Sequence, residues 1–107
     1  MKALQEGVQK MSRRDKIAFI FPGQGSQYVG MGKDFYDNFR ASKKVFDEAS
    51  EVLEMDLKSI CFGGSKEELL KTENTQPAIL ATCIAILRAL ESEGLDCDYT
   101  AGLSLGE

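Results

Sequence analysis

The sequence contains no histidine and no tryptophan, and it has only two prolines and three cysteines. Without histidine, the chain itself supplies neither an imidazole base nor a histidine metal ligand. Cys61, Cys83 and Cys97 lie 22 and 14 residues apart. They form no C-x-x-C pair, which excludes the usual patterns for zinc sites and redox dithiols. Cys83 lies in an apolar run, so we expect it to be a small core residue in a protein of a reducing compartment.

Long apolar segments are missing as well. The longest mostly apolar run, residues 78–87, has 10 residues, whereas a bilayer-spanning helix needs about 20. No basic segment followed by an apolar one opens the chain as a secretory signal would. We therefore expect a cytoplasmic protein without a membrane segment.

Positive charge is scarce beyond the first residues. Residues 1–16 carry a net charge of +3 and the rest of the 107 residues carry −7, which gives −4 in total. An acidic body argues against a nucleic-acid partner, because phosphate binding needs a clustered basic face. We interpret residues 1–15 as a disordered polar leader, with a binding tail as the alternative and Met11 as a second possible start. Residues 16–107 then form one domain.

Two short runs of β-forming residues predict strands. The first, residues 17–21, ends abruptly at Pro22, and the second covers residues 99–103. An unbroken apolar run such as 17–21 favours a strand buried on both faces of a parallel sheet. With helices between the strands, the order predicts a right-handed parallel crossover and an α/β fold with a parallel-sheet core flanked by helices.

Helical patterns fill the first part of the segment between the strands. Residues 28–38 begin a helix that two glycines interrupt, and residues 42–53 predict an amphipathic surface helix. The apolar stripe expected to face the core in this second helix consists of Val45, Ala49, Val52 and Leu53.

Two more helices are expected from their capping residues. Ser65 and Glu68 have the spacing of a capping box, which predicts a short helix through Lys71. Thr75 is expected to cap a longer helix, which Gly94 closes. The body of that helix, residues 78–90, is apolar on nearly every side and should be buried.

A Gly-x-Ser-x-Gly pattern directly follows the second predicted strand. Gly102, Ser104 and Gly106 fit a nucleophile elbow, in which a serine sits in a tight strand-to-helix turn and glycines avoid collisions with neighbouring backbone. The N–H of Leu105 then faces a developing oxyanion. The alternative is that Ser104 only caps a following helix.

The loop at residues 23–27 invites a nucleotide-binding interpretation, which fails on residue type. A dinucleotide fingerprint would need glycine where Tyr28 stands, and a P-loop would need glycine at Gln27 and Ser or Thr at Asp34. What remains is a glycine-rich turn at the carboxyl end of a strand, where α/β folds bind their ligands. If the strands are parallel, this loop and Ser104 emerge at the same sheet edge. A bare tight turn is the alternative.

Three segments together resemble a known family. Residues 21–27 read FPGQGSQ, residues 74–78 read NTQPA and residues 101–107 read AGLSLGE. In this order and spacing they resemble malonyl-CoA:acyl carrier protein transacylases and the related acyltransferase domains of fatty acid and polyketide synthases. The resemblance covers about residues 16–107. It implies the amino-terminal part of an α/β-hydrolase-like acyltransferase domain, incomplete beyond the elbow.

The resemblance also implies roles for individual residues. Ser104 would be the nucleophile that takes the malonyl group from coenzyme A, and the backbone N–H groups of Gln24 and Leu105 would hold the oxyanion. Gln76 would lie near the active site, although it equally suits a helix-start residue that bonds local backbone. The family usually carries histidine before the serine, where this chain has Leu103. That histidine is not the general base, so the departure leaves the role of Ser104 unchanged.

Members of this family are several times longer than this chain. Their later sequence supplies the general-base histidine, an arginine for the malonyl carboxylate and a small ferredoxin-like subdomain, so we expect this chain alone to be inactive. The implied activity moves malonyl from malonyl-CoA to the phosphopantetheine thiol of acyl carrier protein in cytoplasmic fatty acid biosynthesis. The resemblance implies no cofactor, no metal and a monomeric full-length enzyme. A serine-elbow hydrolase of the esterase or lipase type and a non-catalytic truncated remnant are the alternatives.

Overall fold

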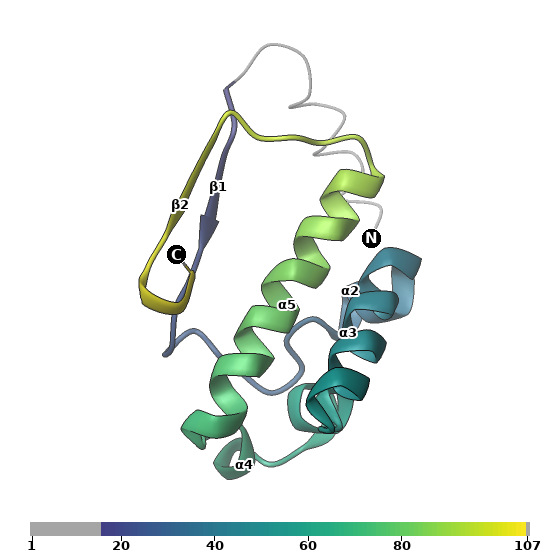
Figure 1. Ribbon diagram of the computed structural model, residues 1–107, viewed down its shortest axis with the longest axis vertical. Coiled ribbons are helices and arrows are strands. Elements are labelled where there is room, and N and C mark those ends of the chain that lie inside the picture. Colours follow the sequence, from purple (N-terminus) through teal and green to yellow (C-terminus); the bar gives the residue numbers. More distant parts are fainter. Residues whose placement is uncertain (1–15, 107) are drawn as a thin grey trace.

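The structure, a computed structural model, describes residues 16–106, and the predicted leader at residues 1–15 lies outside them. Several helices lie between two strands in chain order, in an α/β arrangement (Figure 1). In chain order the elements are β1 (Ala18–Phe21), α2 (Lys33–Asn38), α3 (Arg40–Leu53), the π-helical turn η1 (Ser59–Gly63), α4 (Lys66–Leu70), α5 (Thr72–Ser92), β2 (Tyr99–Gly102) and the 3-10 turn η2 (Ser104–Gly106).

The two strands lie side by side and run in the same direction. Their register pairs Ala18 with Tyr99 at one end and Phe21 with Gly102 at the other. Both predicted strands and their parallel pairing are therefore confirmed. Because the carboxyl ends of parallel strands meet at one sheet edge, the loop after β1 and the turn after β2 emerge together.

Helix α5 lies between the sheet on one side and α3 on the other (Figure 1). Small residues let α3 approach closely, and the buried Ser42 Oγ donates to the carbonyl of Ala85 at 2.7 Å. The predicted burial of residues 78–90 is confirmed only in part, since Leu80 is 49% exposed. The buried residues of the helix are Asn74, Thr75, Ala78, Ile79, Ala81, Thr82, Ala85 and Ala89. The core therefore sits around α5.

The centre of the core is aromatic. Phe46 of α3 is fully buried, with its ring centroid 5.0 Å from that of Phe62 and 6.0 Å from that of Tyr36. Leu57, Leu69 and Cys61 are likewise fully buried. This cluster fixes α3 against α5 and the short elements between them.

The prediction that β1 is buried on both faces is wrong for the described residues. Ile20 is 76% exposed, whereas Phe19 and Phe21 are half-buried. The alternation arises because the helices of residues 16–106 all lie on one side of the sheet (Figure 1).

The apolar stripe predicted for residues 42–53 also differs from the observed one. Val52 is 80% exposed, and the fully buried side chains of α3 are Ser42 and Phe46.

The capping predictions are confirmed for Ser65 and Gly94 and wrong for Thr75. Ser65 Oγ accepts the Glu68 N–H at 3.1 Å and begins α4, as expected. Gly94, with φ of +82°, closes α5 in a Schellman motif, in which the N–H of Leu95 donates to the carbonyl of Leu90. Thr75 is not the cap of α5, because that helix begins three residues earlier at Thr72.

The hydroxyl of Thr75 instead donates back to the carbonyls of Leu69 and Lys71. Asn74 Nδ2 likewise donates to the Glu68 carbonyl at 2.9 Å. These bonds join α4 to α5 and hold the additional turn that precedes Pro77. The glycine-interrupted helix expected within residues 28–38 is confirmed only for Lys33–Asn38, after turns at the glycines.

Candidate active site

Ser104 lies immediately beyond β2, in the tight turn η2. Leu103 still pairs with β1, since its N–H donates to the Phe21 carbonyl at 3.1 Å, and the Gly106 N–H closes the turn on the Leu103 carbonyl at 3.0 Å. Ser104 has a φ of +54°, which residues other than glycine and asparagine rarely adopt. A plain helix N-cap has extended backbone, so this geometry favours the elbow over the cap for Ser104.

The glycines around the turn are required by close backbone contacts. A Cβ on Gly106 would lie 2.0 Å from the Phe21 carbonyl oxygen. A Cβ on Gly23 would lie 2.6 Å from the Leu103 carbonyl oxygen and 3.4 Å from Ser104 Cβ. The turn after β2 and the loop after β1 are therefore packed against each other, backbone to backbone, with Ser104 at their contact.

The loop at residues 23–27 is held by its own side chains. Ser26 Oγ donates to the Gly23 carbonyl at 2.8 Å, and the Gly25 N–H donates to Gln27 Oε1 at 2.7 Å. Gly25 takes a φ of +111°. These bonds fix the peptide that joins Gly23 to Gln24, so the Gln24 N–H is held in place next to the residue that contacts Ser104. A fixed donor of this kind is what an oxyanion hole requires.

Gln24 also connects the loop to the start of α5. Its side-chain Nε2 donates to Thr72 Oγ1 at 3.5 Å. Thr72 is a contact that the sequence analysis did not anticipate. Its only signal was a position before the NTQPA segment, and threonine at a helix start is too common to single it out.

Gln76 is exposed on the first turns of α5. Together with Pro77 and Leu105 it lines a groove of about 450 Å³ that also borders α3. Gln76 therefore borders the same groove as Leu105, the residue that follows the candidate nucleophile. Its neighbours in the motif have a structural role, since Asn74 and Thr75 hold α4 to α5.

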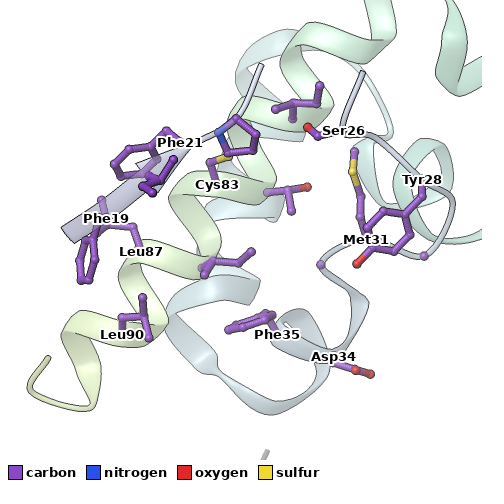
Figure 2. A pocket seen from close by; sticks show the side chains of 17 residues that line it. Phe19, Phe21, Ser26, Tyr28, Met31, Asp34, Phe35, Cys83, Leu87 and Leu90 are labelled. Carbon is purple, nitrogen blue, oxygen red and sulfur yellow. The ribbon is translucent and has the colours of Figure 1, made fainter. Parts of the chain in front are cut away.

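A second hollow, of about 400 Å³, lies between β1, α5 and α2. Figure 2 shows Phe19, Leu87 and Leu90 on one side of it and Phe35 and Met31 across from them. Its lining is mostly apolar, and it meets the candidate site only at its end, where Pro22 and Ser26 line it.

Cysteine chemistry does not contribute to this site. Cys83 lines the hollow of Figure 2 and packs against the core as a free thiol, and burial raises its pKa. A raised thiol pKa disfavours the reactive thiolate. Among residues 16–106, no three acidic or cysteine side chains gather as metal ligands. In the same part of the chain, no helix is long and apolar enough to cross a membrane.

Residues 18–107 match the acyl transferase domain family. The malonyl CoA-acyl carrier protein transacylase of Bacillus subtilis strain 168 is 55% identical over 92 residues, which are 86% of this chain and 29% of that protein. A probable mitochondrial malonyl-CoA-acyl carrier protein transacylase of Drosophila melanogaster is 39% identical, over 96% of this chain and 28% of its own length.

Solved structures agree with the sequence comparisons. The malonyl CoA-acyl carrier protein transacylase of Clostridium perfringens superimposes with a TM-score of 0.82 at 53% identity, over 87% of this chain and 29% of its own. A type II polyketide synthase malonyl-transacylase in complex with its acyl carrier protein gives 0.80 at 44% identity, over 86% and 30%. The chain spans 24% to 29% of the length of these and similar curated relatives. It belongs to the acyl transferase domain family, and its fold is that of the amino-terminal part of malonyl CoA-acyl carrier protein transacylases.

Proposed function

We propose that this chain provides the nucleophile and the oxyanion-binding backbone of a malonyl transferase that works between coenzyme A and acyl carrier protein. The observation that carries the proposal is the strained turn at Ser104, with φ of +54°, against which Gly23 packs. A non-glycine residue in this region costs on the order of 1–3 kcal/mol and recurs at active sites. Family membership supports the same chemistry.

The transfer proceeds in two displacement steps. Ser104 Oγ attacks the thioester carbonyl of malonyl-CoA, its proton passes to a base, and coenzyme A leaves as the thiol once it is protonated. The phosphopantetheine thiol of acyl carrier protein then attacks the malonyl-serine ester, and Ser104 recovers its proton as the new thioester forms. In both steps, the backbone N–H groups of Gln24 and Leu105 stabilise the tetrahedral oxyanion. One such donor contributes about 10²–10³-fold in rate.

Two groups that this reaction needs are not supplied by the 107 residues. A serine hydroxyl is a poor nucleophile until a base takes its proton, and the chain contains no histidine. The resemblance implies that the base and an arginine for the malonyl carboxylate come from the later part of the domain. Gln76, which lines the same groove as Leu105, is a neighbour of the acyl group in this scheme. The proposed reaction takes place in the cytoplasm and belongs to fatty acid biosynthesis.

A chimera tests the proposal directly. Residues 18–107 replace the matched segment of the Bacillus subtilis relative, and the purified chimera is incubated with radiolabelled malonyl-CoA. We expect label on Ser104 that transfers to added holo-acyl carrier protein. The Ser104→Ala chimera should lose more than about 1,000-fold in transfer rate. The 107-residue chain alone should take up no label above its own Ser104→Ala variant.

Two results would contradict the proposal. One is a folded chimera in which Ser104→Ala transfers malonyl as fast as the parent. The other is release of malonate to water at a rate unaffected by acyl carrier protein, which would instead indicate a hydrolase.

A further inference from the structure

The first turn of α5, residues 72–76, precedes a proline within the same helix. Pro77 has no N–H to donate into the helix, and a proline disfavours helical backbone at the residue before it. The five residues of the turn include no apolar one, and Thr72, Glu73 and Gln76 are exposed. Burial of apolar surface therefore does not hold this turn, and another interaction must stabilise it.

Two buried polar side chains provide that interaction. Thr75 is fully buried, and its hydroxyl bonds to the carbonyls of Leu69 and Lys71. Asn74 Nδ2 donates to the Glu68 carbonyl at 2.9 Å. These partners belong to α4 and to the residue that follows it, and α4 lies beside the start of α5 (Figure 1). The turn is therefore fixed to a second helix, whereas an unsupported helix end would fray.

The fixed turn presents Thr72 to the loop at residues 23–27. Gln24 Nε2 donates to Thr72 Oγ1 at 3.5 Å, across 48 positions of sequence. The bonds made by the side chains of Ser26 and Gln27 stay within the loop. Thr72 thus ties the loop to a helix, and it does so at the residue whose backbone N–H is the candidate oxyanion donor.

We propose that Thr72 is a positioning residue of the oxyanion site, whose hydroxyl holds the Gln24 side chain and thereby sets the direction of the Gln24 backbone N–H. The inference rests on the proposed function, in which that N–H stabilises the tetrahedral oxyanion. Side chain and N–H share one α-carbon, so holding the first restricts rotation of the second. An oxyanion donor is effective when its direction is fixed before the charge develops. Ser26 and Gln27 fix the loop internally, and Thr72 fixes it relative to α5.

The size of the effect follows from the bond itself. It is long and exposed, so water competes for both partners and the net contribution is at the low end for a hydrogen bond. Thr72→Val removes the hydroxyl and keeps the shape of the side chain. We expect it to slow the attack of Ser104 about two- to fivefold, far less than loss of a whole oxyanion donor, which costs about 10²–10³-fold.

The first measurement uses the 107-residue chain and does not depend on its activity. Amide hydrogen exchange at Gln24 and Gly25, followed by NMR, should be faster in Thr72→Val than in the parent, and Thr72→Ser, which keeps the hydroxyl, should restore the slower rate. Glu73→Gln is the matched control, because Glu73 is exposed on the same turn and takes no part in the bond between Gln24 and Thr72. Circular dichroism shows that each variant is folded.

The second measurement follows labelling of Ser104 by malonyl-CoA in the chimera described above. Thr72→Val should lower kcat and leave KM unchanged, because the oxyanion is absent from the bound substrate. Thr72→Ser should restore kcat. Gln24→Met removes the same bond from its other side and keeps the backbone N–H. Adding Thr72→Val to Gln24→Met should therefore slow the reaction no further.

Loop exchange in Thr72→Val equal to that of the parent would overturn the proposal. Losses from Gln24→Met and Thr72→Val that multiply in the double variant would do so too, as would failure of Thr72→Ser to restore kcat. A parent chimera that transfers no malonyl contradicts the proposed function instead, and the exchange rates then decide by themselves whether Thr72 holds the loop.

Discussion

The backbone of Ser104 has a φ of +54°, and this single torsion connects the stability of the chain to its chemistry. The left-handed conformation costs an L-residue about 1–2 kcal/mol, which glycine does not incur. We therefore expect the free energy of unfolding of Ser104→Gly to exceed that of Ser104→Ala by about 0.5–1 kcal/mol, after the greater unfolded-state entropy of glycine is counted. The urea midpoint of Ser104→Gly should accordingly be the higher of the two. Ala101→Gly, in the regular strand beside it, should instead destabilise. A lower midpoint for Ser104→Gly than for Ser104→Ala would contradict the strain.

Glycine is required at position 106 because there is no room for a side chain there. A Cβ there would lie 2.0 Å from the Phe21 carbonyl oxygen, which belongs to backbone and has no freedom to rotate away. We expect Gly106→Ala to separate the turn from β1 and to cost at least 2 kcal/mol, about the scale of overpacking. Gly63→Ala is the control, because a Cβ there meets nothing within 4 Å. Equal urea midpoints for the two variants would show that the turn and β1 are not in this contact.

Burial makes the thiol of Cys61 unreactive. It is fully buried, and desolvation raises its pKa to about 11. At pH 8 we expect iodoacetamide to modify the half-buried Cys97 of the native chain and to leave Cys61 intact, as mass spectrometry of peptides would show. In urea both should react. Modification of Cys61 in the native chain at a rate equal to that of Cys97 would mean that the core opens far more readily than its packing indicates.

At the scale of elements, the seam between α3 and α5 depends on one aromatic side chain. Phe46 is fully buried against Phe62 and Tyr36, and Gly32 packs on its ring edge. Truncation to alanine leaves a cavity that helices fixed on several sides cannot fill. We expect Phe46→Ala to cost about 3–5 kcal/mol in the free energy of unfolding. Val52→Ala, on the exposed side of the same helix, should change it by less than about 0.5 kcal/mol. Urea titration of both variants measures the difference.

Local signals were sufficient to predict several element boundaries from the sequence. Pro22 ends β1, Ser65 begins α4 and Gly94 ends α5, because each acts through its own backbone or through bonds to residues next to it. The start of α5 was not predictable in the same way. It depends on Asn74 and Thr75 bonding back to α4, and such bonds form only once two helices are already placed.

The candidate site divides similarly. The position of Ser104 after a strand follows from a five-residue pattern, and its meeting with the residue 23–27 loop follows from parallel pairing of the strands. Which face of β1 is covered could not be inferred from the sequence. An apolar run indicates that a strand is buried in the complete fold, but it does not identify the segment that covers each face. Ile20 is therefore the residue at which the sequence and the described structure disagree most.

On the scale of the whole molecule, the carboxylate of Asp47 on the helical side links separate elements. Asp47 of α3 accepts Lys43 Nζ at 2.7 Å and Tyr36 Oη of α2 at 2.9 Å, and Lys58 approaches from the segment before η1. The hydrogen bond from Lys43 is the main cause that lowers the pKa of Asp47, and that from Tyr36 adds to it. The pKa of Asp56 is lowered mainly by the hydroxyl of Ser59.

These lowered pKa values fix the sign of the acid response. A carboxyl group that is more acidic in the folded state binds protons preferentially when unfolded, so its stabilisation is full above its ordinary pKa of about 3.9. The stabilisation disappears as the pH falls through that value toward the lower pKa of the folded state.

We expect the urea midpoint to be level from pH 7 to about pH 5 and to fall between pH 5 and pH 3. Asp47→Asn should lower the midpoint at pH 7 and make the fall shallower, whereas Asp96→Asn, on the loop before β2, should leave the slope unchanged. A midpoint of Asp47→Asn that falls as steeply as that of the parent would show that the carboxylate of Asp47 does not hold α2 to α3.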